Sequence, residues 1–475
     1  MSTKVLVLGA GFAGHTAALH LSHLVKDKAE VTVVAPRNRF TWFPSLIWVG
    51  TGTMPEDEVS FQLAPVYEKI GLNYLDGRAT VINPDDRTVT VVDSHDTEQT
   101  LSYDFLINAT GPYLNFAATP GLGPQNDTTA SVCSIEHAVD ARERYLKTVR
   151  EMERGNKQRL VVGVGHPTAT CEGAAFEYLM NVDNDLRRRG LREKADLVWL
   201  TNEPAPGDFG VDGIEAMKGR SLVTGAGLVR MLLDEAGVKT MLEAGVTKVE
   251  QGKLYYEQVG YDPSTLDFDF AMLIPQFRGI PIKYVAHDGT DITEKMTMPN
   301  GFMRVDADYT PKPYEQYKGS DWPAYYRSPL YANVYAAGIA FAPPHPMSKG
   351  KKTADGTQII AMAPRTGMAS GIMGRTVAYN IADQVEGREP SHHARMSEMP
   401  AACIASMGKS LLTGSAASII MSPVARDYEK YPQYGRDLKL CDVDVGLGGA
   451  WTKLMLHHTF MWKLQAKPGW QMIPE

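Results

Sequence analysis

The sequence lacks several features that would place it in other large classes of protein. No run of about 18 or more apolar residues occurs, which argues against an ordinary transmembrane helix. The formal net charge is −7, so no basic footprint suggests a nucleic-acid partner. Only four cysteines occur, with no CxxC pair, which is too few for a disulfide scaffold and matches no zinc site. No basic segment followed by an apolar stretch opens the chain, so we expect no cleavable signal.

The remaining composition is that of an ordinary globular enzyme. Hydrophobic residues make up 44% and charged residues 22% of the 475 residues, which is enough for two or three domains and a sizeable core. For any one cysteine in such a chain, the default expectation is a buried and inert side chain.

A dinucleotide-binding fingerprint opens the chain. Residues 4–14, KVLVLGAGFAG, predict a buried strand, a glycine turn and the start of a helix, and a second strand is expected over 30–35. Gly9, Gly11 and Gly14 supply the GxGxxG pattern. These glycines let the backbone approach a pyrophosphate, which would rest on the helix N-terminus.

The expected partner for the adenosine ribose is missing from this unit. An acidic residue usually ends the second strand, but here that strand ends Val-Ala-Pro-Arg at residues 34–37. We therefore expect backbone groups near Ala35 and Ala79 to hold the adenosine instead.

Two later segments complete the pattern of an FAD site. Residues 103–112, YDFLINATGP, form a hydrophobic strand that ends in Ala-Thr-Gly, as in flavoproteins with two dinucleotide-binding domains. Residues 333–339, NVYAAGI, form another strand that runs into glycine, with isoleucine where an aspartate usually binds the ribityl chain. Three such segments in this order predict FAD as the cofactor, and the contacts expected from the last two are Thr110, Gly111, Gly338 and Ile339.

A second strand, turn and helix lies between these segments, where a nicotinamide-dependent relative would carry its own glycine motif. In residues 159–171, RLVVGVGHPTATC, Gly163 and Gly165 remain but Thr168 stands at the third glycine. The pattern therefore weakens the case for a nicotinamide site. Cys171 occupies the helix start, where a lowered thiol pKa would favour a reactive thiolate. The alternative is a small residue packed under the turn.

The chain changes character after about residue 389. Residues 391–400 are polar and end in proline, which suggests a boundary, and residues 411–423 are apolar but too short to span a bilayer. Residues 450–464 form an amphipathic helix, and lysines at 453, 463 and 467 add positive charge. This pattern suits the headgroup boundary of a membrane, although a helix docked on its own core or on a partner subunit is the competing interpretation. The residues of the expected apolar face are Trp451, Leu454, Met455 and Trp462.

At this point the chain resembles a known family, the sulfide:quinone oxidoreductases, which are monotopic membrane flavoproteins of the two-dinucleotide-binding disulfide reductase superfamily. The similarity covers nearly the whole length. It rests on five segments beyond the FAD signatures: FTWFPSLIWVG at 40–50, SVCSIEHA at 131–138, TCEGAAFE at 170–177, PRTG at 364–367 and AACIASMG at 401–408.

The resemblance implies roles for individual residues. Cys171 and Cys403 would form the redox-active pair on one flavin face, and Cys133 would assist by attachment to FAD or by sulfur handling. Glu177 matches a proposed base and His137 a histidine thought to help proton transfer. The remaining implied contacts are Pro44, Arg365, Thr366 and Gly367 for FAD, and Lys453, Ile404, Leu456 and Phe460 for a quinone on the opposite flavin face.

The resemblance also implies the fold and the partners. We expect an α/β protein with two Rossmann-like dinucleotide-binding domains of the glutathione reductase type and a C-terminal membrane-docking region. The expected domains are an FAD domain at 1–115 and 300–390, a second domain at 116–299 and the C-terminal region at 391–475. Sulfide, a membrane quinone and the bilayer surface would be its partners, with peripheral membrane association and a homo-oligomeric state.

Some positions depart from the family pattern. Asp208 replaces a second family histidine, Ile404 and Leu456 stand where aromatic residues sandwich the quinone, and residues 347–358 read as an insertion near the active site. Cys441 has no counterpart and is interpreted as structural. These departures keep three alternatives open: a type II NADH:quinone oxidoreductase, a flavocytochrome c sulfide dehydrogenase flavin subunit, and a flavin-binding scaffold without turnover.

Overall fold

The computed structural model describes residues 2–475, and a five-stranded parallel sheet organises its N-terminal part. The strand order is β22-β9-β1-β2-β5, and every neighbouring pair is parallel. The strands are short, and all except the edge strand β5 are mostly apolar, as expected where helices cover both faces of a parallel sheet. They are β1 (Thr3–Leu8), β2 (Ala29–Ala35), β5 (Asn73–Asp76), β9 (Phe105–Asn108) and β22 (Val334–Ala336).

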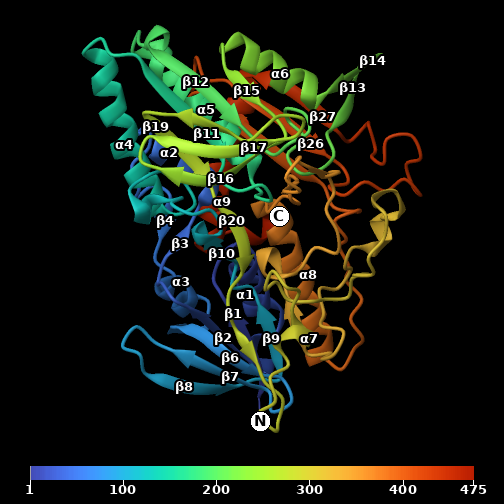
Figure 1. Cartoon of the computed structure of the whole chain (residues 1–475). Helices are drawn as coiled ribbons and strands as arrows, with labels where there is room; N and C mark the ends of the chain where they lie inside the picture. The colour runs from blue at the N-terminus through green and yellow to red at the C-terminus, as the bar shows by residue number, and fades with distance from the viewer. Residues whose placement is uncertain (1) are drawn as a thin grey trace.

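Two helices distant in sequence pack closely together beside this sheet. Helix α1 (Phe12–Leu24) follows β1, and α8 (Gly367–Val385) lies against it (Figure 1). Their backbones approach closely because Gly374 has no side chain: a Cβ there would lie 2.2 Å from the carbonyl oxygen of Ala13. This close packing holds residues 364–385 beside the glycine turn that precedes α1.

A second parallel sheet forms the upper part of the molecule in Figure 1, with the order β15-β12-β11-β19. Its strands are β11 (Gln158–Val164), β12 (Ala195–Leu200), β15 (Lys239–Met241) and β19 (Phe270–Ile274). Helices α4 (Ile135–Glu153) and α5 (Glu172–Arg188) pack against it. The antiparallel pair β10 (Pro112–Asn115) and β20 (Gln276–Gly279) carries the chain between the two sheet units.

The C-terminal residues form a small antiparallel sheet and a long helix. Strands β25 (Ala401–Ser406), β26 (Ala416–Met421) and β27 (Asp442–Gly446) pair in that order, and α9 (Leu447–Leu464) follows. Both α5 and α9 contact β25. The strand that carries Cys403 is therefore held between the helix that begins beside Cys171 and the C-terminal helix.

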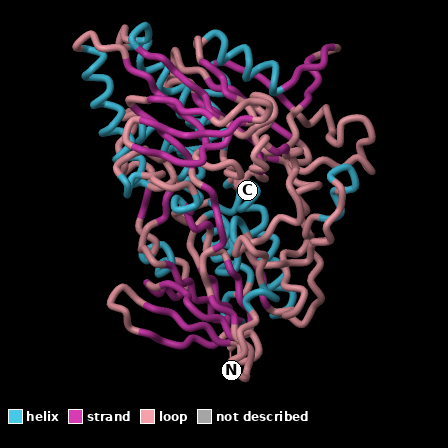
Figure 2. The backbone as a smooth tube through the Cα atoms, viewed as in Figure 1, coloured by secondary structure: helices cyan, strands magenta, loops and turns pink. Residues whose placement is uncertain are grey.

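The remaining elements are shorter and extend the two units, and Figure 2 shows how much loop joins them. The helices are α2 (Leu46–Gly50), α3 (Ala64–Lys69), α6 (Gly225–Glu235) and α7 (Thr293–Met296). The strands are β3 (Phe40–Thr41), β4 (Ser60–Phe61), β6 (Arg78–Asn83), β7 (Thr88–Val92), β8 (Glu98–Ser102), β13 (Glu215–Lys218), β14 (Ser221–Thr224), β16 (Ala244–Glu250), β17 (Lys253–Gln258), β18 (Ser264–Asp267), β21 (Lys283–Tyr284), β23 (Lys351–Lys352) and β24 (Gln358–Ile359).

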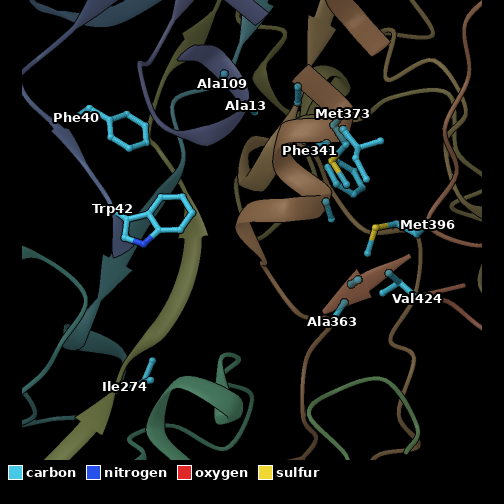
Figure 3. Close-up of a cluster of buried hydrophobic side chains, with 14 of the residues drawn as sticks. Ala13, Phe40, Trp42, Ala109, Ile274, Phe341, Ala363, Met373, Met396 and Val424 are labelled. Carbon is cyan, nitrogen blue, oxygen red and sulfur yellow. The ribbon is translucent and has the colours of Figure 1, made fainter. Parts of the chain in front are cut away.

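The main hydrophobic core runs through both sheets and into the C-terminal region. Figure 3 shows part of it, with Phe40 and Trp42 on one side and Phe341, Met373 and Met396 on the other. Among residues 2–475, no helix is long and apolar enough to cross a membrane.

The exposure of several side chains on helix α9 differs from the sequence-based expectation. Trp451, Met455 and Trp462 are exposed as expected. Lys453 and Lys463, expected to supply surface charge, are instead 7% and 1% exposed. Each of them pairs with a buried carboxylate, so this part of the prediction is wrong.

Candidate active site

The first glycine turn leaves open space at the start of α1. Gly9 has φ +95°, and a Cβ there would lie 2.2 Å from the carbonyl oxygen of Ala109, so only glycine fits. A Cβ on Gly11, the N-cap residue, would meet no atom within 4 Å among the described residues. Gly14 packs against the carbonyl of Gly9. Free helical N–H groups beside open space fit the pyrophosphate of a dinucleotide.

The other expected FAD contacts lie around the same end of the sheet. Thr110 donates a hydrogen bond from its hydroxyl to Asn108 Oδ1 at 2.8 Å, and Gly111 has φ +77° with open space at its Cβ position within the described chain. The lining of a narrow cavity next to α8 includes residues of the segments 333–339 and 364–367, namely Gly338, Ile339, Pro364, Arg365 and Thr366. Gly367 begins α8 and contacts the ring of Phe12. These residues fit FAD.

The backbone groups expected to hold the adenosine already take part in secondary structure. The carbonyl of Ala35 accepts a hydrogen bond from Gly77 N at 2.9 Å, and Ala79 pairs with Val91 on β7. Pro44 lies in a short 3-10 helix that leads into α2. No contact to a nucleotide follows from these positions, and they stay predictions.

The structure brings Cys403 to the start of α5. Cys171 is the N-cap residue of α5 and adopts a left-handed backbone conformation with φ +71°. Two residues later, a Cβ on Gly173 would lie 3.2 Å from Cys403 Sγ, so the absent side chain leaves room for this sulfur. Cys133 lies close enough to Cys171 to add to the effect of burial, which raises the pKa of the Cys171 thiol. No disulfide joins these cysteines among the described residues.

The prediction of a lowered thiol pKa for Cys171 is wrong for the site with reduced cysteines. Burial raises the pKa of the Cys171 thiol well above its usual value, and nearby Cys133 raises it further. Burial also raises the pKa of Cys133 and of Cys403 to about 11 each. A helix N-terminus favours a thiolate only where water or cations compensate the loss of hydration. Any thiolate formed here therefore has a strong tendency to take up a proton.

Glu177 lies beside Cys403 and forms a buried ion pair with Lys453. Lys453 Nζ donates to Glu177 Oε2 at 2.9 Å, and the two side chains are only 8% and 7% exposed. Ser406 donates its hydroxyl proton to Glu177 Oε1 at 2.7 Å. Because Glu177 raises the pKa of Cys403, the carboxylate is close to that thiol.

Two further side chains complete this network and were missed by the sequence interpretation. Trp48 Nε1 donates to Ser406 Oγ at 2.9 Å, and Asn181 Nδ2 donates to the same oxygen at 2.9 Å. Both donors come from helices, α2 and α5, that pack together. Asn181 follows Glu177 by one helical turn, so the i, i+4 spacing is the signal that could have identified it.

The residues expected to line a quinone site lie on the other face of β25 and on α9. Cys403 and Ile404 are consecutive in the strand, so their side chains point to opposite faces. Phe460 stacks on Trp42 with ring centroids 5.4 Å apart, and Leu456 is half-buried. Beside them is a surface hollow lined by Lys409, Ser410, Leu411, Trp451, Leu454, Met455 and His458.

Two residues singled out in the sequence lie apart from the cysteines' contacts. His137 packs its ring edge-on against Phe116 at 5.5 Å, and no hydrogen bond joins it to a thiol within residues 2–475. Burial lowers the pKa of His137. Cys441 is buried, and its sulfur accepts a hydrogen bond from Ser422 N at 3.4 Å, as suits a structural residue.

Three buried carboxyl groups lie around the start of α5. Glu172, Glu203 and Asp208 are 1%, 0% and 3% exposed. Thr201 donates its hydroxyl proton to Glu203 Oε2 at 2.8 Å, and Phe209 N donates to Glu203 Oε1 at 2.8 Å. Neither oxygen of Glu172 has a hydrogen-bond partner among the described residues. Sequence reasoning considered only Asp208 of this group.

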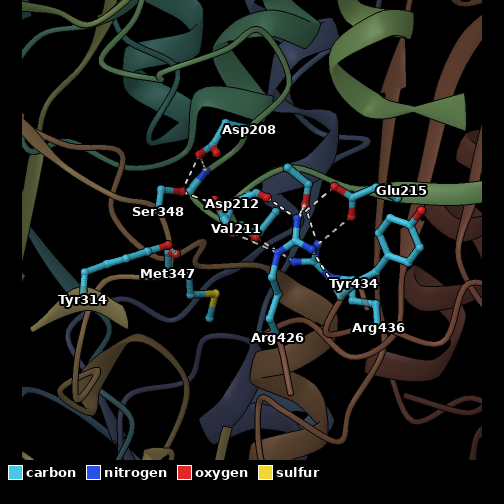
Figure 4. Close-up of polar contacts among 12 residues, drawn as sticks. Asp208, Val211, Asp212, Glu215, Tyr314, Met347, Ser348, Arg426, Tyr434 and Arg436 are labelled. Atoms are coloured by element: carbon cyan, nitrogen blue, oxygen red, sulfur yellow. Dashed lines mark hydrogen bonds and ion pairs between the residues drawn. The ribbon is translucent and has the colours of Figure 1, made fainter. Parts of the chain in front are cut away.

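The segment 347–358 holds Asp208 in place. Ser348 donates its hydroxyl proton to Asp208 and accepts a hydrogen bond from Asp212 N at 3.0 Å. Arg426 then pairs with Asp212 at 3.0 Å and with Glu215 at 3.1 Å, as Figure 4 shows. The ion pairs of Arg426 in this region are therefore with Asp212 and Glu215.

The buried carboxyl group of Glu203 predicts a pH dependence of stability. Burial raises the pKa of Glu203 from 4.5 to about 8. Between these values the folded chain binds a proton that the unfolded chain has lost, so stability falls as the pH rises through this window. Urea unfolding at several pH values should show a smaller loss of stability for Glu203→Gln than for the natural chain. Equal losses in both proteins would contradict the raised pKa.

Comparisons with known proteins agree with this arrangement. Residues 3–185 match the family described as pyridine nucleotide-disulphide oxidoreductase. The chain is 28% identical over 410 residues to the sulfide-quinone reductase of Aquifex aeolicus (strain VF5), covering 86% of this chain and 82% of that protein. The X-ray structure of the sulfide:quinone oxidoreductase from Aquifex aeolicus matches with a TM-score of 0.78 and 25% identity, covering 98% of this chain and 92% of that chain.

A more distant match shows the fold alone. The structure of NDH2 from Plasmodium falciparum in complex with RYL-552 aligns with a TM-score of 0.64 at 13% identity and covers 98% of this chain and 96% of that chain. The predicted α/β fold with two Rossmann-like units is confirmed by the parallel sheets and by these matches. Together with the cysteine segments and the glycine cradle, these matches show an oxidoreductase that is similar to the sulfide:quinone oxidoreductases.

Proposed function

We propose that this protein oxidises sulfide at a Cys171–Cys403 redox pair and passes two electrons through FAD to a membrane quinone. Similarity to sulfide-quinone reductases supports the overall reaction. The observation that carries the finer assignment is the position of Cys403 Sγ against Gly173, two residues from Cys171. FAD, held by the glycine turn and the residues around α8, would accept two electrons from the sulfur site and deliver them to the quinone.

The sulfur step follows from the chemistry of the two cysteines. Hydrosulfide is a soft nucleophile and a disulfide is its natural target. Attack on a Cys171–Cys403 bridge forms one new S–S bond and breaks the old one. One cysteine becomes a persulfide and the other leaves as a thiolate. Passage of two electrons to FAD would then close the persulfide and the thiolate into a bridge that is one sulfur longer. Renewed attack by hydrosulfide on that bridge would lengthen the product toward polysulfide.

The Glu177–Lys453 ion pair links a residue expected to act as a base at the sulfur site with a residue expected to bind the quinone. Glu177 is close enough to Cys403 to affect its pKa, which supports a role in proton transfer at the sulfur site. Lys453 reaches the same carboxylate from α9 at 2.9 Å. Its charge is already balanced in the resting site, so it would stabilise negative charge on a quinone oxygen only by sharing its protons between Glu177 and that oxygen.

The second glycine turn favours sulfide over a nicotinamide as the reductant. Ile360 N and Met362 N donate to the carbonyls of Pro167 and Ala169 at 3.0 and 3.1 Å, so the segment after β24 covers this turn. Asn202 Nδ2 also donates to the Ala169 carbonyl, at 3.1 Å. These contacts fill the place where a nicotinamide dinucleotide would approach the turn and the start of α5.

A comparison of two reductants tests this choice. With a short-chain quinone present, sulfide should drive quinone reduction and NADH should give no turnover above background. The control is the same assay after removal of FAD, which should abolish both rates. Rapid quinone reduction by NADH would move the protein to the type II NADH:quinone oxidoreductases. Turnover with neither donor would favour a flavin-binding scaffold.

The exposed apolar face of α9 supports peripheral attachment to a membrane. Trp451, Met455 and Trp462 recur at helical spacing and are 53%, 58% and 46% exposed. Leu411 and Leu412 extend this face, and the Leu411 carbonyl accepts a hydrogen bond from Trp451 Nε1 at 2.8 Å. Aromatic and aliphatic side chains on one face of a helix suit the headgroup boundary.

Charge substitutions on this face should release the protein from lipid. Each large apolar side chain contributes about 1.5–3 kcal/mol when buried, so Trp451→Glu or Met455→Glu should weaken vesicle binding roughly 10- to 100-fold. Co-sedimentation with liposomes measures the effect. Tyr261→Glu, at an exposed position outside α9, is the matched control and should bind normally. Undiminished binding of both α9 variants would contradict membrane docking through this helix.

A further inference from the structure

The carboxyl groups of Glu172 and Glu203 lie next to the two reactive cysteines and have no role in the proposed reaction so far. Glu172 directly follows Cys171 at the start of α5. A Cβ on Gly173 would lie 3.2 Å from Cys403 Sγ and 3.7 Å from the ring of Phe209, and the backbone N–H of Phe209 donates to Glu203. Each cysteine thus has one of the two carboxyl groups near it.

Both oxygens of Glu203 accept hydrogen bonds, from Thr201 and from Phe209 N, whereas the surroundings of Glu172 point to a bound proton. Glu172 is 1% exposed, and neither of its oxygens has a hydrogen-bond partner within the described part of the chain. Asn202, immediately before Glu203, has a buried Oδ1 that likewise lacks a partner among residues 2–475. A buried carboxylate without donors is costly, whereas a protonated carboxyl group is not. The same site therefore favours storage of a proton.

The charged groups around the pair reinforce this preference. On α5, Cys171 directly precedes Glu172, and on β25, Cys403 places its Sγ 3.2 Å from the position that a Cβ on Gly173 would take. On the loop after β12, Asp208 adds negative charge, and burial together with the neighbouring carboxyl groups raises the pKa of Glu172. The cations nearby are committed elsewhere: Lys453 pairs with Glu177, and Arg426 pairs with Asp212 and Glu215. Arg365 lies near Cys171 and lowers its pKa slightly against the larger effect of burial.

We propose that Glu172 and Glu203 form a carboxyl pair that exchanges a proton with the thiols of Cys171 and Cys403 during sulfide oxidation. This inference rests on the proposed function. When hydrosulfide opens the disulfide, the released thiolate takes a proton from the pair, which leaves one thiol and one carboxylate. When two electrons pass to FAD, an S–S bond forms between this cysteine and the outer sulfur of the persulfide. The thiol proton then returns to the carboxylate, and the persulfide proton leaves to solvent.

The test compares neutral and acidic substitutions in the FAD-loaded protein. Glu172→Gln and Glu203→Gln keep the shape of the side chain but cannot release a proton. They should slow sulfide-driven flavin reduction by roughly 10²-fold and flatten its pH profile. Glu172→Asp and Glu203→Asp retain an acid and should recover part of the rate. Glu193→Gln, an exposed position just beyond α5, serves as the control and should behave like the natural chain.

Infrared spectroscopy gives a readout that a merely structural role would not change. At neutral pH the natural protein should show the carbonyl stretch of a protonated carboxyl group, and this band should change when sulfide is added. Loss of the band in both Gln variants supports the pair. If sulfide reduces the natural protein but the band stays constant and the variants keep the natural pH profile, the carboxyl pair is refuted and the proposed function survives. If sulfide does not reduce the natural protein, the proposed function fails and the inference fails with it.

Discussion

Cys403→Ala is expected to abolish sulfide-driven reduction of the flavin while FAD stays bound. The substitution removes one sulfur of the proposed disulfide, so hydrosulfide has no S–S bond to attack. Loss of a covalent nucleophile in other enzymes lowers turnover on the order of 10⁶-fold, and we expect a similar collapse here. FAD should remain bound because Cys403 lies on β25, outside the glycine turn and the α8 cavity that would hold the cofactor. Stopped-flow absorbance of the flavin after anaerobic mixing with sulfide measures the effect.

Cys441→Ala is the matched control for this experiment. Cys441 is a second free thiol of the C-terminal region, but it is buried and its sulfur contacts Ser422 instead of the α5 start. Its rate should equal that of the natural chain. A Cys403→Ala protein that still bleaches at the natural rate would remove the disulfide mechanism.

Breaking the Glu177–Lys453 pair from one side should strongly destabilise the fold. Lys453→Met leaves the carboxylate of Glu177 buried without its cation, and Glu177→Gln leaves the ammonium of Lys453 buried without its anion. Removal of one partner of a buried ion pair typically costs about 3–5 kcal/mol. The double variant Glu177→Gln/Lys453→Met should recover most of this loss, because neither buried charge remains. Urea unfolding of the four proteins measures the coupling.

An exposed ion pair provides the comparison. Lys218 and Asp442 are 2.6 Å apart, but both side chains are 40% exposed, so water screens them. Lys218→Met should therefore change stability far less than Lys453→Met. If the two single variants at the buried pair lose stability additively in the double variant, the ion pair does not couple these residues.

The early part of the fold could be predicted from sequence because its signals are local. Gly9, Gly11 and Gly14 specify a turn between a strand and a helix, and the structure places them at the end of β1 and the start of α1. The exposed Trp451 and Met455 also follow from helical spacing alone. Such patterns need only neighbouring residues to be recognised.

The candidate site depends on contacts that no local pattern reports. Lys453 reads as a surface lysine on an amphipathic helix. Only the packing of α9 and of α5 against β25 reveals that Glu177 neutralises it in the interior. The thiol of Cys171 was expected to be acidic from its place at a helix start, but burial raises its pKa. Glu172 could not be singled out from the sequence, because its lack of hydrogen-bond partners among the described residues depends on what surrounds it in the folded interior. Which charges pair and which side chains are buried depends on the tertiary structure.

Anaerobic mixing of the FAD-loaded protein with sulfide tests the central claim most directly. The account predicts prompt bleaching of the flavin, and return of the oxidised spectrum when a short-chain quinone is added. Reduction of the flavin by sulfide and its reoxidation by the quinone would then be established in a single experiment. A flavin that stays oxidised with sulfide, yet is bleached by NADH, would contradict the account.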